Sequence, residues 1–353
     1  MPTVFTYVCK QRLASFRAPI NSGSPSHPAA FKQFKAQTGA APTRTIMPPP
    51  QGTKNPLEGP ADYTFTKQVH SDTYPAIDPT KVSLFDKSVF VSGASKGLGR
   101  SIAISFAKAG ASKIAIGARS DLSTTEKAVK DAAAKAGRPE PQLLSLKLDI
   151  TSKESVEAAA AKVKTDFGGR LDILINNAGV LAGRAPVAAA DPDAWWSNFQ
   201  ANLLGPYLTC RSFLPLMGPG AIVFSISSVG AHCITPELSA YQTSKLAVLR
   251  LTEFLAVENP DVTSIVLHPG NMLTDIVGKG EGMDENLKAV FTETTDLCAD
   301  GLTFLAGKHS GSDGIGWLSG RYVNITWDLP ELVGPEKRKE IVDGDKLKVR
   351  LVV

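Results

Sequence analysis

One stretch of the chain, from Ser228 to Lys245, holds three side chains that could together move a proton. Tyr241 and Lys245 are four residues apart, so on a helix they lie on the same face. A neighbouring ammonium favours the phenolate and so lowers the pKa of a tyrosine from about 10 toward the working range. Ser228 follows a short apolar run and could hold a substrate oxygen by a hydrogen bond. The group therefore suits proton transfer to or from an alcohol or carbonyl oxygen, although an isolated Tyr-x-x-x-Lys pair is usually ordinary helix surface.

A glycine-rich turn lies far upstream of this stretch. It runs from Ser92 to Arg100, between an apolar run and a helical pattern, and has glycines at positions 93, 97 and 99. Glycines allow a tight bend and a close approach to a pyrophosphate, which then faces the amino end of the helix. Glycine-rich turns are common in ordinary loops, but a strand before and a helix after favour dinucleotide binding.

Short apolar runs alternate with longer helical patterns along most of the chain. The runs are continuously apolar, as expected for strands that are buried on both faces. We therefore predict an α/β fold: a doubly wound, Rossmann-type sheet of about seven parallel strands with helices on both faces. The predicted strands lie at 89–91, 113–116, 143–148, 173–175, 221–226, 264–267 and 322–325, and the predicted helices at 97–109, 124–136, 153–166, 192–214, 238–258 and 284–308.

Taken together, these motifs resemble the short-chain dehydrogenase/reductase family, in its smaller single-domain branch, over about residues 85–330. The glycine spacing is G-x-x-x-G-x-G, and each further motif follows a successive strand. Any one of them has an ordinary reading as a turn or a helix residue, but all of them in family order are specific. The further motifs are Asn176–Gly179, Asn202, the group Ser228, Tyr241 and Lys245, and Pro269–Thr274, with Met272 where valine is more usual. The arm around 63–79 and the chain from Ser319 onward are similar to uncharacterised fungal members.

The resemblance implies a role for each site residue. Tyr241 would be the general acid in reduction or the base in oxidation, and Lys245 would lower its pKa and bind the nicotinamide ribose. Ser228 would hold the substrate oxygen, and Asn202 would hold a water that connects Lys245 to solvent. The implied cofactor-binding residues are Gly93, Ser95, Lys96, Gly97, Leu98, Gly99, Arg119, Asp149, Asn177, Ala178, Gly179, Tyr241, Lys245, Pro269, Gly270, Met272 and Thr274.

The residues after the second predicted strand indicate which nicotinamide cofactor the chain would take. NAD users of the family usually have an acid where Ala118 stands, whereas Arg119 and Lys96 offer positive charge to a 2′-phosphate. We therefore expect NADP(H). Asp121 is counter-evidence because it could reach a ribose, but it also fits a cap of the next helix. Asp149 would contact adenine, or else cap the helix that follows it.

These expectations describe an oxidoreductase that transfers a hydride between NADP(H) and a ketone or secondary alcohol. Two alternatives stay open: a non-catalytic NADP(H)-binding regulator or scaffold, and an isomerase or dehydratase on the same fold. Candidate substrate-pocket segments are 181–186, 230–238 and the glycine-containing 275–283, a lid or a surface loop. His232 lies beside the site but is assigned no catalytic role. The substrate, the direction and the stereochemistry are not predicted, and the resemblance suggests a homodimer or homotetramer.

Composition excludes several other classes of function. The chain has 353 residues, is 43% hydrophobic and carries a net charge of only +4, which gives no reason to expect nucleic-acid binding. Its four cysteines are scattered, so neither a metal site nor a disulfide framework is expected, and no apolar run is long enough to span a membrane. We expect a cytoplasmic location.

Four segments are predicted along the chain. Residues 1–46 contain basic residues but no Asp or Glu, so they are a disordered extension or a mitochondrial targeting segment, unless translation begins at Met47. Residues 47–84 form an irregular arm, 85–330 the catalytic domain and 331–353 a tail.

Overall fold

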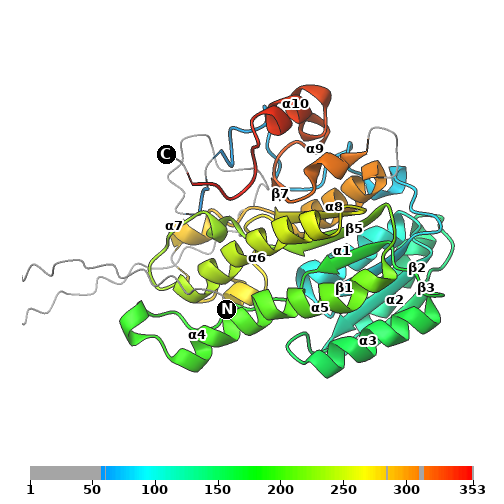
Figure 1. Cartoon of the computed structure of the whole chain (residues 1–353), viewed down its shortest axis with the longest axis horizontal. Helices are drawn as coiled ribbons and strands as arrows, with labels where there is room; N and C mark the ends of the chain where they lie inside the picture. Colours follow the sequence, from blue (N-terminus) through cyan, green and yellow to red (C-terminus); the bar gives the residue numbers. More distant parts are fainter. Residues whose placement is uncertain (1–56, 60, 284, 310–313, 352–353) are drawn as a thin grey trace, which may run out of the picture. The chain divides into compact units, whose positions relative to one another are not determined.

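A parallel sheet of seven strands forms the centre of the protein in the computed structural model, which describes residues 57–59, 61–283, 285–309 and 314–351 (Figure 1). The strand order is β3-β2-β1-β4-β5-β6-β7, and every neighbouring pair is parallel. The strands are β1 (Ser88–Ser92), β2 (Lys113–Ala118), β3 (Gln142–Lys147), β4 (Ile173–Asn176), β5 (Ala221–Ile226), β6 (Val262–His268) and β7 (Arg321–Asn324). The predicted doubly wound sheet is confirmed. The order reverses between β1 and β4, and such a switch point opens a crevice at the carboxyl ends of the strands.

The sheet is apolar on both faces because successive side chains of each strand enter different cores. In β1, Val89 and Val91 belong to one core, whereas Phe90 belongs to the other and packs on Phe213. Helices α1 (Gly97–Lys108), α2 (Ser123–Lys135) and α8 (Thr295–His309) pack together on the first core. Helices α3 (Lys153–Asp166) and α5 (Gly205–Phe213) cover the second core. The continuous apolar runs therefore reflect burial on both faces.

Two of the predicted helices are interrupted. The expected helix at 192–214 is α4 (Pro192–Phe199), a π-helical segment at Gln200–Leu204 and then α5. The stretch at 284–308 contains the short α7 (Glu285–Lys288) and, after a break, α8. Helical spacing of apolar residues continues through both regions, so it gives no sign of the extra residue that a π segment accommodates.

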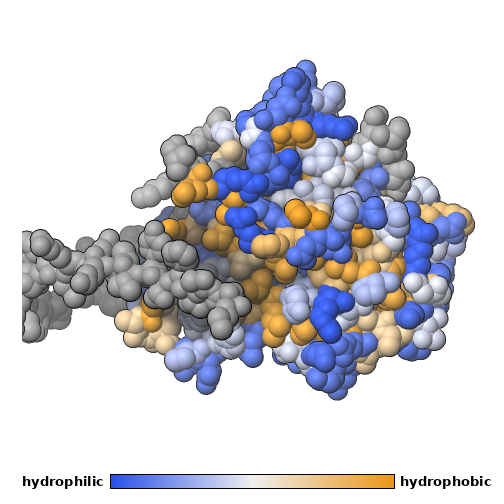
Figure 2. Space-filling view, viewed as in Figure 1, coloured by the Kyte–Doolittle hydropathy of each residue, from blue (hydrophilic) through white to orange (hydrophobic). Residues whose placement is uncertain are grey.

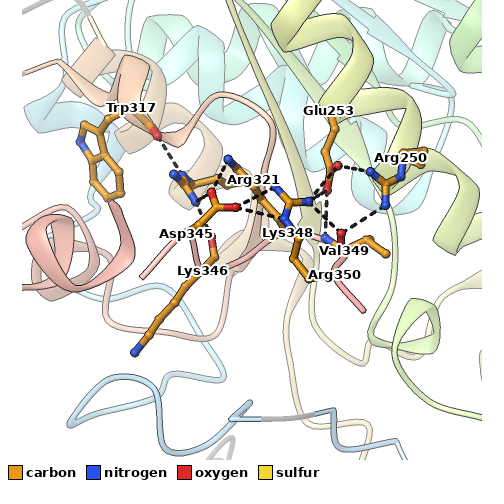
Figure 3. A network of polar contacts seen from close by, with 9 residues as sticks. All are labelled: Arg250, Glu253, Trp317, Arg321, Asp345, Lys346, Lys348, Val349 and Arg350. Atoms are coloured by element: carbon orange, nitrogen blue, oxygen red, sulfur yellow. Dashed lines mark hydrogen bonds and ion pairs between the residues drawn. The ribbon is translucent and has the colours of Figure 1, made fainter. Parts of the chain in front are cut away.

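Both ends of the described chain pack on the sheet edge near β7. In the arm, the Trp327 indole donates to Asp62 O at 3.0 Å, and Val69 forms an antiparallel bridge with Trp327. After α9 (Leu329–Leu332) and α10 (Pro335–Asp343), residues 345–350 form a network of ion pairs with β7 and with α6 (Ser239–Glu258), as Figure 3 shows. The predicted segment 1–46 and residues 47–56 of the predicted arm lie outside the described residues. The segment boundaries stay predictions.

Over the part of the chain that the structure describes, no helix combines the length and the apolar character that crossing a bilayer requires.

Candidate active site

Ser228, Tyr241 and Lys245 come together at the carboxyl end of β5. Ser228 follows the strand and begins a short 3₁₀ turn, in which its Oγ accepts the Gly230 N–H at 3.0 Å. Tyr241 and Lys245 lie in the first two turns of α6, with Lys245 Nζ 5.7 Å from the centroid of the Tyr241 ring. A hydrogen bond from Ser228 reaches the Tyr241 phenol. The three side chains that the sequence singles out therefore share one place.

Burial dominates the electrostatics of this group. Lys245 is 3% exposed, its Nζ donates to Ile226 O at 3.0 Å, and burial lowers its pKa to about 8. Burial also raises the pKa of Tyr241, and the hydrogen bond from Ser228 lowers it only in part. The net shift of the Tyr241 pKa in this structure is therefore upward, and the lowering expected from Lys245 stays a prediction. The cost of burying a phenolate exceeds the stabilisation that the site supplies to it.

Asn202 lies in the π segment, and its side chain is fully buried. Its Oδ1 accepts the Val180 N–H at 2.9 Å, while its Nδ2 donates to Val180 O at 2.9 Å and to Ser244 Oγ at 3.1 Å. A methyl group at Gly179 would lie 3.0 Å from Asn202 Oδ1 and 3.4 Å from Lys245 Nζ. Asn202 is thus held close to Lys245, across a glycine that leaves room between them. The water assigned to it stays a prediction.

The glycine turn fits a dinucleotide. Gly93 has φ +70°, and a Cβ there would lie 2.8 Å from Ala178 Cα, while a Cβ at Gly99 would lie 2.3 Å from Gly93 O. Asn177 Nδ2 holds the turn by donating to Ser92 O at 2.9 Å. Helix α1 begins at Gly97, and the side chain of Lys96, the residue before it, makes no capping hydrogen bond. An uncapped helix start at a strand switch point is suited to phosphate.

The remaining turn residues support this geometry. The carbonyl of Ser95 accepts from the Arg100 guanidinium, and Leu98 packs on the first core. In the loop after β6, Pro269 is half-buried, Gly270 has φ +95° and Met272 is buried. The two loops approach each other, because a Cβ at Gly97 would lie 3.9 Å from Thr274.

The residues predicted to distinguish NADP(H) from NAD(H) make separate contacts and do not form one cluster. Arg119 is exposed and pairs with no carboxylate of the described residues, whereas Lys96 forms an ion pair with Asp275 at 3.1 Å. Hydrogen bonds from Thr151 hold the pKa of Asp149 below its usual value, and the nearby Arg119 charge lowers it further. Asp121 accepts from Ser123 N–H at 3.3 Å, as a residue at a helix start does.

Two buried side chains near the site are missing from the sequence prediction. His268, the last residue of β6, accepts the Val229 N–H on its Nδ1 at 3.0 Å. Glu293 accepts the Asn271 N–H at 2.7 Å and packs on Gly270, and burial raises its pKa to about 6. The only signal for His268 is its place before Pro269, and Glu293 lies in a stretch without a motif.

Two of the candidate substrate segments are joined to each other, because the Ala185 N–H donates to Glu237 O at 3.3 Å. His232 stacks edge-on against Tyr322 with the ring centroids 4.6 Å apart, which fits a wall and not a second base. The arm reaches the same loop, where Cys233 Sγ donates to Glu58 O at 3.4 Å. The segment 275–280 is a distorted 3₁₀ turn that Asp275 ties to the glycine turn through Lys96. Among the described residues, no group of three or more His, Cys, Asp and Glu side chains could hold a metal ion.

Comparison with known proteins adds sequence and fold relatives. A family model described as short chain dehydrogenase matches residues 87–284, which include the glycine turn and all four predicted catalytic residues. Short chain dehydrogenase pigC of Monascus ruber is 48% identical over 310 residues, which cover 87% of this chain and 100% of that protein. Short chain dehydrogenase tazN of Aspergillus terreus is 47% identical over 82% of this chain, which spans only 63% of that protein.

Solved structures share the fold. Carveol dehydrogenase from Mycobacterium avium, in complex with NAD, has a TM-score of 0.61 at 22% identity and covers 71% of this chain and 100% of its own. The alcohol dehydrogenase from the archaeon Thermococcus sibiricus, complexed with 5-hydroxy-NADP, has a TM-score of 0.52 at 25% identity and covers 62% of this chain and 89% of its own.

Proposed function

This chain belongs to the short-chain dehydrogenase family, an oxidoreductase family, and from that premise we propose that it interconverts a ketone and a secondary alcohol with NADP(H). The observation that carries the proposal is the meeting of Ser228, Tyr241 and Lys245. Lys245 lies next to Gly179, and the residues just before Gly179 pack on the glycine turn. A phenol, a hydroxyl and an ammonium at one point are the groups that proton transfer to a carbonyl oxygen needs.

Each catalytic residue has a defined task in this proposal. Tyr241 gives a proton to the substrate oxygen in reduction and takes one in oxidation. Because its pKa lies above the usual value, the phenol is protonated at neutral pH, which suits reduction. Ser228 orients the substrate oxygen beside Tyr241, and Asn202 holds a water that connects Lys245 to solvent.

A bound nicotinamide would supply or accept the hydride. We propose that the glycine turn and the first turn of α1 hold its phosphates, that Lys245 holds the adjoining ribose, and that the loop at 269–274 contacts the ring. The preference for NADP(H) rests on Arg119, which is exposed and forms no ion pair with a carboxylate of the described residues. Lys96 would have to leave Asp275 to add its charge to a 2′-phosphate.

We also propose that the protein is a homodimer or homotetramer. Exposed apolar side chains on α6, at Leu246, Phe254 and Val257, support this, and Figure 2 shows hydrophobic surface on the face that it views. The compartment, cytoplasmic or mitochondrial, stays a prediction that sequencing the mature amino terminus would test.

The proposal is tested by screening the purified full chain with NADPH and NADH against a panel of carbonyl compounds and alcohols. Tyr241→Phe should lower turnover by about 10²-fold or more, because the proton donor is lost, while NADPH affinity changes less than about 2-fold. The matched control is Tyr207→Phe, since Tyr207 is a half-exposed tyrosine of α5 outside the site.

Retained turnover in Tyr241→Phe would contradict the role assigned to Tyr241. NADPH binding without turnover of any panel compound would favour a non-catalytic role, and product formed without net NADPH consumption would favour an isomerase or dehydratase.

A further inference from the structure

His268 joins the two loops on either side of the reacting group. Its backbone ends β6 and runs directly into Pro269, while its side chain crosses to the turn after β5. The imidazole is 3% exposed, and Nδ1 accepts the Val229 N–H at 3.0 Å. A buried histidine that accepts from a backbone N–H holds that backbone in one position.

The backbone held by His268 is the one that carries Ser228. On the other side of the serine, Ser227 N–H donates to Leu267 O at 2.7 Å, so β6 fixes the residues before and after Ser228. The Ser228 hydroxyl is itself anchored by the Gly230 N–H at 3.0 Å. Loss of the bond at Val229 would release one side of this turn and let Ser228 Oγ move relative to Tyr241.

The acceptor must remain unprotonated for this contact to persist. Burial, and to a lesser degree the neighbouring His232, lower the pKa of His268 to about 3. The Nδ1 lone pair is therefore available at any pH near neutral, and the proton of the neutral ring resides on Nε2.

We propose that His268 is a positioning residue, which acts through Val229 to hold the Ser228 hydroxyl where it can bond Tyr241 and the substrate oxygen. The inference rests on the proposed function for its effect on turnover. The contact with Val229 can be tested without turnover.

Three substitutions at position 268 distinguish the effect of losing the hydrogen-bond acceptor from the effect of changing the size of the side chain. In His268→Asn the amide oxygen can take the place of Nδ1, whereas in His268→Gln the amide lies farther along the side chain, near the place of Nε2. His268→Leu keeps the size of the side chain and removes the acceptor. We expect His268→Asn to stay within about 3-fold of the wild-type kcat and His268→Leu to lose at least 10-fold. The Kd for NADPH should change less than about 2-fold in all three. Thermal unfolding shows whether each variant folds, and His268→Gln replaces His268→Leu in the comparison if the latter does not fold.

Hydrogen exchange of the segment 227–231, measured on the same proteins, reports the contact directly. The Val229 amide should exchange at least 10-fold faster in His268→Leu than in the wild type, with protection restored in His268→Asn. Equal exchange in His268→Asn and His268→Leu, or faster exchange with unchanged kcat, would overturn the inference. A wild-type protein that turns over no panel compound would count against the proposed function, and the exchange data would still show whether His268 holds this turn.

Discussion

Lys245 is an ammonium that the fold keeps buried without a carboxylate partner among the described residues. Burial lowers its pKa to about 8, against about 10.4 for an unfolded chain. At pH 7 the buried ammonium therefore destabilises the folded state. One pKa unit corresponds to about 1.4 kcal/mol, which bounds this cost at roughly 3 kcal/mol. Lys245→Met should therefore raise the free energy of unfolding at pH 7 by about 1–3 kcal/mol, less the lost bond to Ile226 O, and abolish turnover.

The stability difference between the wild type and Lys245→Met should depend on pH. Between about pH 8 and 10.4 the folded wild type releases the proton while the unfolded chain keeps it, so wild-type stability should rise with pH relative to Lys245→Met. Urea unfolding of both proteins from pH 7 to 10 measures the difference. A variant that is less stable than the wild type at pH 7 would mean that the ammonium is well solvated in the folded protein.

Arg119 is the residue on which the NADP(H) preference rests. An arginine that meets a phosphate contributes about 1.4 kcal/mol or more, so Arg119→Ala should weaken NADPH binding about 10-fold and leave NADH binding within 2-fold. Arg338→Ala, which removes an exposed arginine from α10, controls for the change in net charge. Fluorescence titration with both cofactors measures the effect, and equal losses for NADPH and NADH would remove Arg119 from the 2′-phosphate site.

Single residues differ in how far the sequence could predict them. The serine, tyrosine and lysine proposed as catalytic lie within one stretch of eighteen positions, from Ser228 to Lys245, so their meeting needs only one strand end and one helix. The direction of the Tyr241 pKa depends on what packs over the phenol, which the stretch does not contain. His268 contacts Val229 across 39 positions, and hydrogen bonds of that range follow only from the assembled sheet.

At the scale of elements, the glycine turn, Asn177 and α1 pack closely against one another. A Cβ at Gly99 would lie 2.3 Å from Gly93 O and 2.5 Å from Asn177 Nδ2, so Gly99→Ala must push the turn away from the segment that follows β4. We expect NADPH affinity to fall more than 10-fold and stability to fall by about 2–4 kcal/mol. Gly218→Ala is the control, because nothing lies within 4 Å of its Cβ and its φ is not positive. Similar NADPH affinity in the two variants would contradict this account.

Most of the strands and helices could be predicted from the sequence. All seven predicted strands exist, because continuous apolar runs bounded by helical patterns leave few other structures possible for a buried sheet. The π segment around Asn202 is absent from the prediction, since the apolar spacing does not change there; within it, the buried Asn202 amide bonds Val180.

For the molecule as a whole, the structures of the arm and the tail are the parts that the sequence predicts least. Both are irregular in pattern, and their partners lie far away along the chain: Asp62 bonds Asn324, and Ser71 O accepts the Thr294 N–H beside Glu293. Through Glu293 the arm is joined to the loop at 270–271, so an addition outside the matched family region supports this loop.

The tail is joined to α6 at Glu253. This carboxylate is 14% exposed, accepts the Val349 N–H at 2.9 Å and bonds the guanidinium groups of Arg250 at 2.6 Å and Arg350 at 3.3 Å (Figure 3). Glu253→Gln keeps the shape but removes the charge that these donors share, so unfolding free energy should fall by about 1–2 kcal/mol. Exchange of residues 345–350 should increase, while NADPH affinity is unchanged because Tyr241 and Lys245 lie at the other end of α6.

The matched control for this ion-pair network is an exposed pair at the end of α10. Asp343 and Lys339 are 60% and 79% exposed, so Asp343→Asn should cost no more than about 0.5 kcal/mol. Urea unfolding at low and high salt compares the two variants, and the Glu253→Gln effect should persist at high salt because the carboxylate is largely shielded from solvent. If both variants cost the same, the tail is held by its backbone contacts, such as the bond from Tyr322 N–H to Leu347 O, and its charges add nothing to the stability of the fold.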